Sequence, residues 1–201
     1  LESTFYQNRV YDAQKQKYGF IDKVGKDTIL PIAYDRIALG HLGRIHVTQY
    51  TRKFDSFYRR NMISETKMGM YSMLGVEIFP PVYKNIEIHL DVYLLTKDGK
   101  TAIYDTLLNP ISDYIYDEKK GPRNPVVMSL AINGKYALFN RYGKRFTAFE
   151  FDKISLLPER GLPFSMIMVT KNGKQAIMDP NGKYYTGFEY ERIIAECHVS
   201  A

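Results

Sequence analysis

The sequence predicts an all-β fold built as a tandem array of five β-hairpin repeats. Three observations lead to this prediction: a recurring six-residue phrase, an aromatic anchor at a near-constant distance from it, and Asn-Gly or Asp-Gly pairs between repeats. Aromatic and β-branched residues favour strands, and the 201 residues include 17 Tyr and 11 Phe. No sustained helical periodicity competes with this pattern. We expect an open solenoid or superhelix of hairpins, with a closed, propeller-like ring as the alternative.

The recurring phrase is Lys, any residue, a tiny residue, two large apolar residues and a short polar residue. Its tiny residue, Gly or Ala, indicates a crowded site where backbones approach closely. The lysines either form a cationic stripe or lie solvated beside strand edges, and the second interpretation is favoured. The five copies open at Lys17, Lys67, Lys100, Lys135 and Lys174.

The second anchor is an aromatic residue, followed in four copies by an acidic one. It stands 15 residues after the tiny residue in the first copy (34 − 19) and 14 in the others (83 − 69, for example). A position that stacks repeat on repeat should be buried, and this is preferred to a ladder of binding aromatics. The acids would partly neutralise the lysines. The aromatics are Tyr34, Tyr83, Tyr116, Phe151 and Tyr190, and the acids are Asp35, Asp117, Asp152 and Glu191.

Turn-forming pairs join the repeats. Asp98-Gly99, Asn133-Gly134 and Asn172-Gly173 each follow an apolar strand, and such pairs favour type I′ hairpin turns. The last strand of one repeat should therefore pair with the first strand of the next. Pro31 and Pro80-Pro81, before the aromatic anchor, should break a strand or mark a sheet edge. We expect one repeat domain over residues 1–201, with repeats near 17–53, 67–99, 100–134, 135–173 and 174–195.

These phrases resemble the WG-repeat family, a bacterial β-repeat. Lys17–Asp22, Gly25-Lys26, Ile29–Pro31 and Tyr34–Ile37 follow its consensus, and the resemblance extends to Ile194. The resemblance implies a non-enzymatic interaction module. The tryptophan that gives the family its name is absent, so a function tied to it is not implied here. Its place is taken by Tyr18, Met68, Thr101, Tyr136 and Gln175.

An insertion of basic and aromatic residues, roughly Tyr50–Thr66, separates the first two repeats. Such residues together can contact phosphates and stack on bases or sugars, and loops carried on a rigid scaffold often hold function. The plain alternative is a solvated, extended hairpin. A weaker candidate of the same kind contains Lys119, Lys120 and Arg123. The predicted binding residues are Arg52, Lys53, Phe57, Tyr58, Arg59 and Arg60.

The residues that catalysis or metal binding would need are not arranged for it. None of the histidines (His41, His46, His89 and His198) has a second ligand at metal-binding spacing. If His41 and His46 shared one strand, their spacing would place them on opposite faces. Cys197 is the one cysteine, and a nucleophile needs an oriented base that its surroundings rarely supply. We therefore predict no enzyme activity, no metal and no cofactor.

The expected function is a non-catalytic binding or scaffold domain, with a protein as the first expected partner. The alternatives are carbohydrate or cell-envelope polymer binding, if several tyrosines are exposed, and nucleic-acid binding through residues 50–60. The net charge of +6 favours anionic partners weakly, so nucleic acid is disfavoured. No apolar run is long enough to cross a bilayer. The chain opens at Leu1 rather than Met, so we expect a processed product or an excised domain, exported if a signal sequence was removed.

Overall fold

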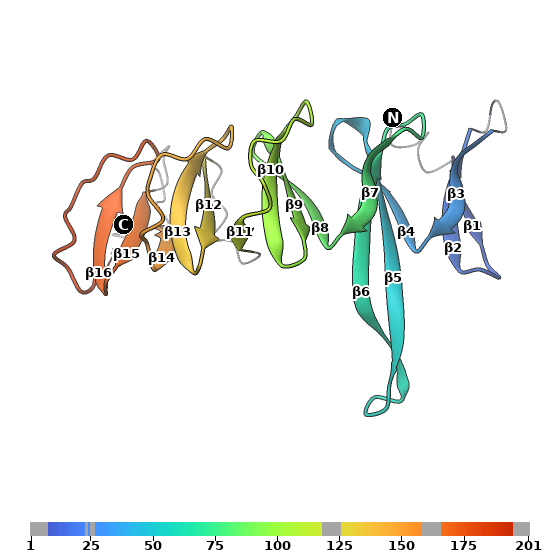
Figure 1. Cartoon of the computed structure of the whole chain (residues 1–201), viewed down its shortest axis with the longest axis horizontal. Helices are drawn as coiled ribbons and strands as arrows, with labels where there is room; N and C mark the ends of the chain where they lie inside the picture. The colour runs from blue at the N-terminus through green and yellow to red at the C-terminus, as the bar shows by residue number, and fades with distance from the viewer. Residues whose placement is uncertain (1–7, 23, 25–26, 118–125, 158–165, 195–201) are drawn as a thin grey trace, which may run out of the picture. The chain divides into compact units, whose positions relative to one another are not determined.

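The computed structural model describes residues 8–22, 24, 27–117, 126–157 and 166–194, and it is all-β, as predicted (Figure 1). One 3₁₀ turn, η1 (His41–Gly43), interrupts the strands. The strands of the first half are β1 (Arg9–Asp12), β2 (Lys17–Ile21), β3 (Thr28–Tyr34), β4 (Arg36–Leu39), β5 (Ile45–Asp55), β6 (Arg60–Tyr71), β7 (Glu77–Tyr83) and β8 (Asn85–His89). Those that follow are β9 (Val92–Lys97), β10 (Lys100–Asp105), β11 (Tyr116–Asp117), β12 (Val127–Ile132), β13 (Lys135–Asn140), β14 (Lys153–Leu156), β15 (Ile167–Lys171) and β16 (Lys174–Met178).

The strands form several small antiparallel sheets. Their orders are β1-β2-β3, β4-β5-β6-β7, β11-β10-β9-β8, β12-β13 and β14-β15-β16. The chain separates into two compact units. One runs to Ile86 and takes in Leu95–Asp98, and the other comprises Glu87–Leu94 and the chain from Gly99 onward. Within the described residues, no helix is long and apolar enough to cross a membrane.

The same strand pairing recurs at all five predicted repeats. The residue after the opening lysine lies opposite the aromatic anchor each time. The five pairs are Tyr18 with Tyr34, Met68 with Tyr83, Thr101 with Tyr116, Tyr136 with Phe151 and Gln175 with Tyr190. The spacing found in the sequence therefore corresponds to one local structure.

The tiny residue lies at a crowded site, as predicted. A Cβ on Gly19 would lie 2.8 Å from Ile32 Cγ1, and one on Gly69 would lie 2.9 Å from the Pro81 nitrogen. At both glycines the partner strand bulges, which brings its backbone closer than alanine would allow. The three alanines at this position, Ala102, Ala137 and Ala176, are fully buried.

The turns and prolines also follow the sequence. Asn133 and Gly134 both have positive φ (52° and 77°), and the other two predicted hairpin turns share this conformation, as type I′ geometry requires. β3 and β7 continue through Pro31 and Pro80-Pro81, and each is an edge strand. The prolines therefore mark edges rather than strand breaks.

Each core combines residues of neighbouring repeats. In the first unit, Phe20, Tyr34, Ile45 and Val47 of the first repeat pack with Tyr71 of the second repeat. The second unit has two such clusters. One joins β9–β11 to β12 and β13, and the other joins β12 and β13 to β14–β16. Burying apolar area of this kind is the dominant favourable contribution to folding, so adjacent repeats stabilise one another.

The predicted burial of the aromatic anchor is correct at three positions and wrong at one. Tyr34, Tyr116 and Phe151 are at most 7% exposed, and Tyr83 is partly buried. Tyr190 is 45% exposed, because no later hairpin of the described chain covers it. The core role of this position therefore depends on the repeat that follows.

Candidate functional site

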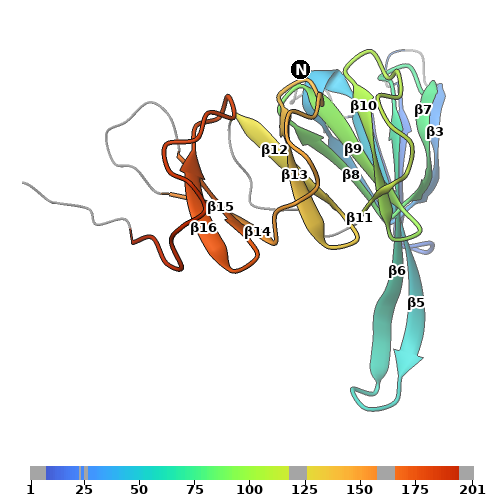
Figure 2. The same ribbon diagram turned by 60° about the vertical axis from the view of Figure 1, so that its left-hand side comes forward.

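The insertion between the first two repeats is an extension of the β5–β6 hairpin. β5 and β6 pair from Ile45 with Tyr71 out to Asp55 with Arg60. Beyond Tyr50 and Thr66, no strand of the described chain pairs with either arm. Figures 1 and 2 show these arms reaching past the strands that flank them. This extension has five residues on β5, Thr51–Asp55, and six on β6, Arg60–Glu65, and it corresponds to about 17 Å.

Two local features shape the hairpin. Ser64 is an extra residue on β6, because Thr51 pairs with Glu65 and Arg52 with Ile63, and such a bulge increases the local twist. At the far end, an Asp55 carboxylate oxygen accepts hydrogen bonds from the amides of Phe57 (2.9 Å) and Tyr58 (3.1 Å). Asp55 therefore holds the turn in place, a role typical of Asp in turns.

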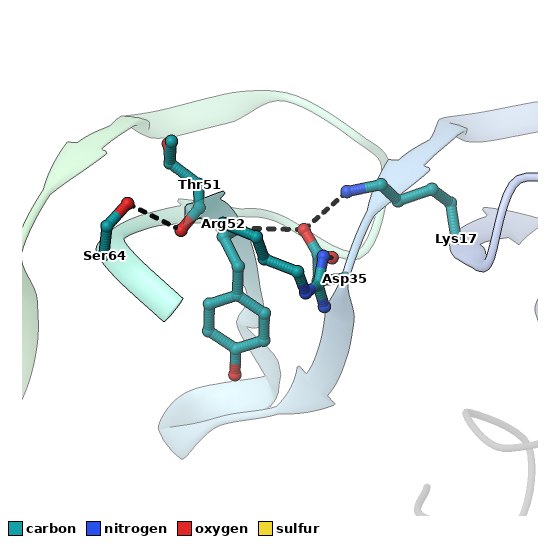
Figure 3. Close-up of polar contacts among 6 residues, drawn as sticks. Lys17, Asp35, Thr51, Arg52 and Ser64 are labelled. Carbon is teal, nitrogen blue, oxygen red and sulfur yellow. Dashed lines mark hydrogen bonds and ion pairs between the residues drawn. The ribbon is translucent and has the colours of Figure 1, made fainter. Parts of the chain in front are cut away.

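The hairpin base, defined here as Tyr50, Thr51 and Arg52, is tied to the body of the first unit through Asp35. The Asp35 side chain is only 2% exposed. Its carboxylate accepts hydrogen bonds from Lys17 Nζ (2.5 Å), Arg52 Nη1 (2.8 Å) and the Tyr50 amide (2.8 Å). Figure 3 shows Lys17 reaching this carboxylate from its own strand.

The three donors make ionised Asp35 the stable form. Burial opposes its ionisation, but the hydrogen bonds from Lys17, the Tyr50 amide and Arg52 outweigh burial. The pKa of the Asp35 carboxyl therefore lies below its ordinary value. Arg52 also lies over the Tyr50 ring, 5.5 Å from its centroid. Its guanidinium is thus held in place by the fold.

The hairpin tip, defined here as Lys53, Phe54, Phe57, Tyr58, Arg59 and Arg60, makes few contacts with the rest of the chain. Phe57 is 85% exposed and Tyr58 is 59% exposed. Their rings pack edge to face with centroids 4.9 Å apart, and Arg60 lies 5.7 Å from the Tyr58 centroid. No acid of the described chain forms an ion pair with Lys53, Arg59 or Arg60.

The two arms give the tip a cationic face and an apolar face. Directly paired residues lie on the same face of a hairpin. Lys53 pairs with Met62, and Arg60 pairs with Asp55, so both cations share one face. Phe54 and Ile63 belong to the other face, and they are 67% and 53% exposed.

The structure therefore divides the predicted binding residues. Lys53, Phe57, Tyr58, Arg59 and Arg60 lie together at the exposed tip. Arg52 lies at the base, where its guanidinium is already paired with Asp35. Its assignment as a binding residue is not favoured, because a contact with a partner would compete with this ion pair.

The opening lysines are paired as well. Lys100 Nζ lies 2.8 Å from Asp117, Lys174 Nζ lies 3.1 Å from Glu191, and Lys135 bonds to Asp152. Lys17 and Asp35 form the corresponding pair in the first repeat. In four repeats, therefore, the opening lysine pairs with the acid that follows the aromatic anchor. The expected partial neutralisation of the opening lysines by these acids is therefore observed, in the form of direct ion pairs. In the second repeat Lys84 replaces the acid, and Lys67 lies 3.7 Å from Glu65 instead.

A second candidate site is an open groove of about 630 Å³, called here the groove of the fifth repeat, which two residues of the fourth repeat help to line. Tyr185 is 55% exposed and Tyr184 is 41% exposed, while Phe188 stacks on buried Phe151 with centroids 6.3 Å apart. Lys171 and Glu150 pair at 2.6 Å in the same groove. Its lining is Glu150, Lys171 and the run from Tyr184 to Tyr190. This groove was not predicted from the sequence, although four aromatics within seven residues, Tyr184 to Tyr190, were a signal for it.

The histidines of the described chain lie apart from this groove and belong to no metal-binding cluster. No histidine lines the groove, and no cluster of three or more His, Cys, Asp or Glu residues is arranged to hold a metal ion. His41 and His46 do not share a strand, because His41 lies in η1 and His46 in β5. Cys197, His198, Lys119, Lys120 and Arg123 lie outside the described residues.

Comparisons with models of known protein families, with curated proteins and with solved structures found no match to this chain.

Proposed function

We propose that this chain is a non-catalytic binding domain that contacts a partner protein through the hairpin tip. One observation carries the proposal: aromatic and cationic side chains are exposed together at the end of a hairpin whose base is fixed by Asp35. Tyr and Arg are enriched among the residues that contribute most to binding at protein interfaces. A rigid base reduces the entropy lost when such residues bind.

The two faces of the tip describe the expected partner. Phe54 and Ile63 of the apolar face would enter an apolar pocket, and Lys53 and Arg60 of the cationic face would face acidic residues at its rim. Charge complementarity of this kind mainly raises the association rate and the specificity. Nucleic acid is the weaker alternative, because the tip offers only three unpaired cations.

We also propose that the repeats form an open solenoid of WG-repeat type, in preference to a propeller-like ring. The recurring register of the five repeats and the cores shared by neighbours within each unit support this proposal. Such arrays generally serve as extended binding surfaces. Non-enzymatic scaffolding is consistent with that organisation.

The test is capture from a lysate of the source organism at low and at high salt. We compare wild type with a tip variant carrying Phe57→Ala, Tyr58→Ala, Arg59→Ala and Arg60→Ala. The control is Arg141→Ala with Tyr142→Ala, since that pair has the same 5.7 Å cation–π geometry and Tyr142 is 64% exposed.

We expect wild type and the control to retain a protein that the tip variant loses, in nuclease-treated lysate as well. Capture that persists in the tip variant would refute the proposed site. Retention of nucleic acid alone, with a steep loss of affinity as salt rises, would replace protein by nucleic acid as the partner.

A carbohydrate-binding role for the groove of the fifth repeat is the second candidate. Exposed Tyr184 and Tyr185 flank the paired charges of Glu150 and Lys171, and small-molecule sites combine aromatic walls with a few polar groups. Titration with a panel of oligosaccharides should show binding that Tyr185→Ala abolishes and Tyr142→Ala preserves. No binding by wild type would exclude this role for the panel tested.

A further inference from the structure

The joint that follows the aromatic anchor has the same design in the first and the fourth repeat. β4 pairs with β5 with Ile37 opposite Val47, and β14 pairs with β15 with Ile154 opposite Val169. Ile37 is 1% exposed and Ile154 is 6% exposed. The segment that follows the aromatic anchor is thus the strand that receives the next hairpin.

Backbone and side-chain hydrogen bonds complete the joint. The amide of Asp35 donates to the Thr48 carbonyl (2.9 Å), and that of Asp152 donates to the Thr170 carbonyl (2.7 Å). In return, the two carboxylates accept bonds from the amides of Tyr50 (2.8 Å) and Asn172 (2.7 Å). Each acid therefore holds the incoming hairpin through both its backbone and its side chain.

The fifth repeat carries the same receiving edge, defined here as Tyr190–Ile194. Tyr190 pairs with Gln175 as the other anchors do, and the Ile193 amide donates to Gln175 Oε1 at 2.7 Å. The edge is therefore in place. It is also uncovered in the described chain, because the Glu191 side chain is 86% exposed and Ile194 is 65% exposed.

The first repeat carries the complementary edge on β1. Val10 lies opposite Gly19, as Val47 lies opposite Gly69 in β5 and β6. β1 is the edge strand of β1-β2-β3. No strand of the described chain pairs with its other side, where β5 has β4. Val10, Tyr11 and Asp12 thus match the strand that a receiving edge binds.

We propose that this chain self-associates head to tail, with the receiving edge of one copy pairing with β1 of a second copy. The interior joints set the register: Arg192 lies opposite Tyr11 of the second copy, and Ile193 lies opposite Val10. The Glu191 amide donates to the Tyr11 carbonyl, and the Glu191 carboxylate accepts from the Ala13 amide. Two different surfaces meet, so the contact is heterologous.

Sedimentation velocity of the 201-residue chain over a wide concentration range tests this proposal. A single strand-to-strand joint is a weak contact, so the average mass should rise with concentration toward the upper end of this range. Ile193→Asp should leave the chain monomeric by placing a charge in the joint. Leu107→Asp, at a side chain that is 79% exposed in another repeat, should associate as wild type does, and so should the tip variant.

A mixing experiment distinguishes this contact from other kinds of self-association. Tyr11→Pro removes an amide from the outer side of β1, a tolerated change on an edge strand, and circular dichroism checks that the variant is folded. Tyr11→Pro and Ile193→Asp should each be monomeric alone and form a dimer when mixed, because each keeps one intact edge. Monomeric wild type at every concentration, or association that Ile193→Asp leaves unchanged, would overturn the proposal.

Discussion

The base and the tip of the β5–β6 hairpin hold similar residues in opposite circumstances. Arg52 at the base bonds to a carboxylate that is 2% exposed, whereas Arg59 and Arg60 at the tip have no acidic partner in the described chain. Each tyrosine lies beside an arginine, but Tyr50 is half-buried whereas Tyr58 is 59% exposed. Side chains of one chemical type therefore serve stability at one end of the hairpin and are available for recognition at the other.

Replacing Asp35 should lower the unfolding free energy more than any other single change at the hairpin base. Asp35→Ala leaves Lys17, Arg52 and the Tyr50 amide without their acceptor. Because the Lys17 and Arg52 side chains are 28% and 47% exposed and stay solvated, the loss comes mainly from the hydrogen bonds to the carboxylate, about 2–3 kcal/mol of unfolding free energy. Chemical denaturation measures the loss.

The matched control for Asp35 is Asp152→Ala. Asp152 makes the equivalent contacts with a lysine and an amide, but its side chain is 38% exposed. Its replacement should destabilise the chain clearly less than Asp35→Ala does. Equal losses at the two positions would contradict the importance of burial at the hairpin base.

Lowering the pH should reduce the stability that Asp35 gives to the hairpin base. The pKa of Asp35 is lowered in the folded state, so its contribution to stability is present above the unfolded pKa of about 3.9. That contribution is lost as pH falls through the folded pKa. Unfolding free energies measured below about pH 4 should fall more steeply for wild type than for Asp35→Asn. Parallel curves would show that Asp35 does not bind its donors as a carboxylate.

Arg52→Ala should lower the unfolding free energy less than Asp35→Ala or Asp35→Asn does. Asp35 keeps Lys17 and the Tyr50 amide, and Arg52 itself is 47% exposed. We expect a loss of at most about 1 kcal/mol in unfolding free energy. A loss as large as that of Asp35→Ala would mean that Arg52, and not Lys17, is the main partner of the buried carboxylate.

The sequence predicted the local structure of the repeats well, because that structure depends on short-range chemistry. Positive φ favours Asn133-Gly134, crowding favours Gly19, and a proline without an amide belongs at an edge, as Pro31 does. Each of these requirements can be recognised from a few adjacent residues of the sequence. The matching spacing of lysine and aromatic then supplied the strand pairing.

The functions of individual side chains were harder to predict, because they depend on contacts across the fold. Nothing near Arg52 in the sequence shows that Asp35, 17 residues earlier, lies within hydrogen-bond reach. Tyr190 follows the same spacing as Phe151, yet it is exposed because no later hairpin of the described chain packs over it. Position within a repeat predicts the local pairing, and the neighbouring repeat decides burial.

The most direct test of the division between base and tip measures stability and partner capture together. The tip variant and Arg52→Ala are compared with wild type in denaturation and in lysate capture. We predict that the tip variant changes the unfolding free energy by less than about 0.5 kcal/mol and loses the partner. Arg52→Ala should lose stability and keep the partner. Loss of the partner in Arg52→Ala, with the tip variant still binding, would contradict the account.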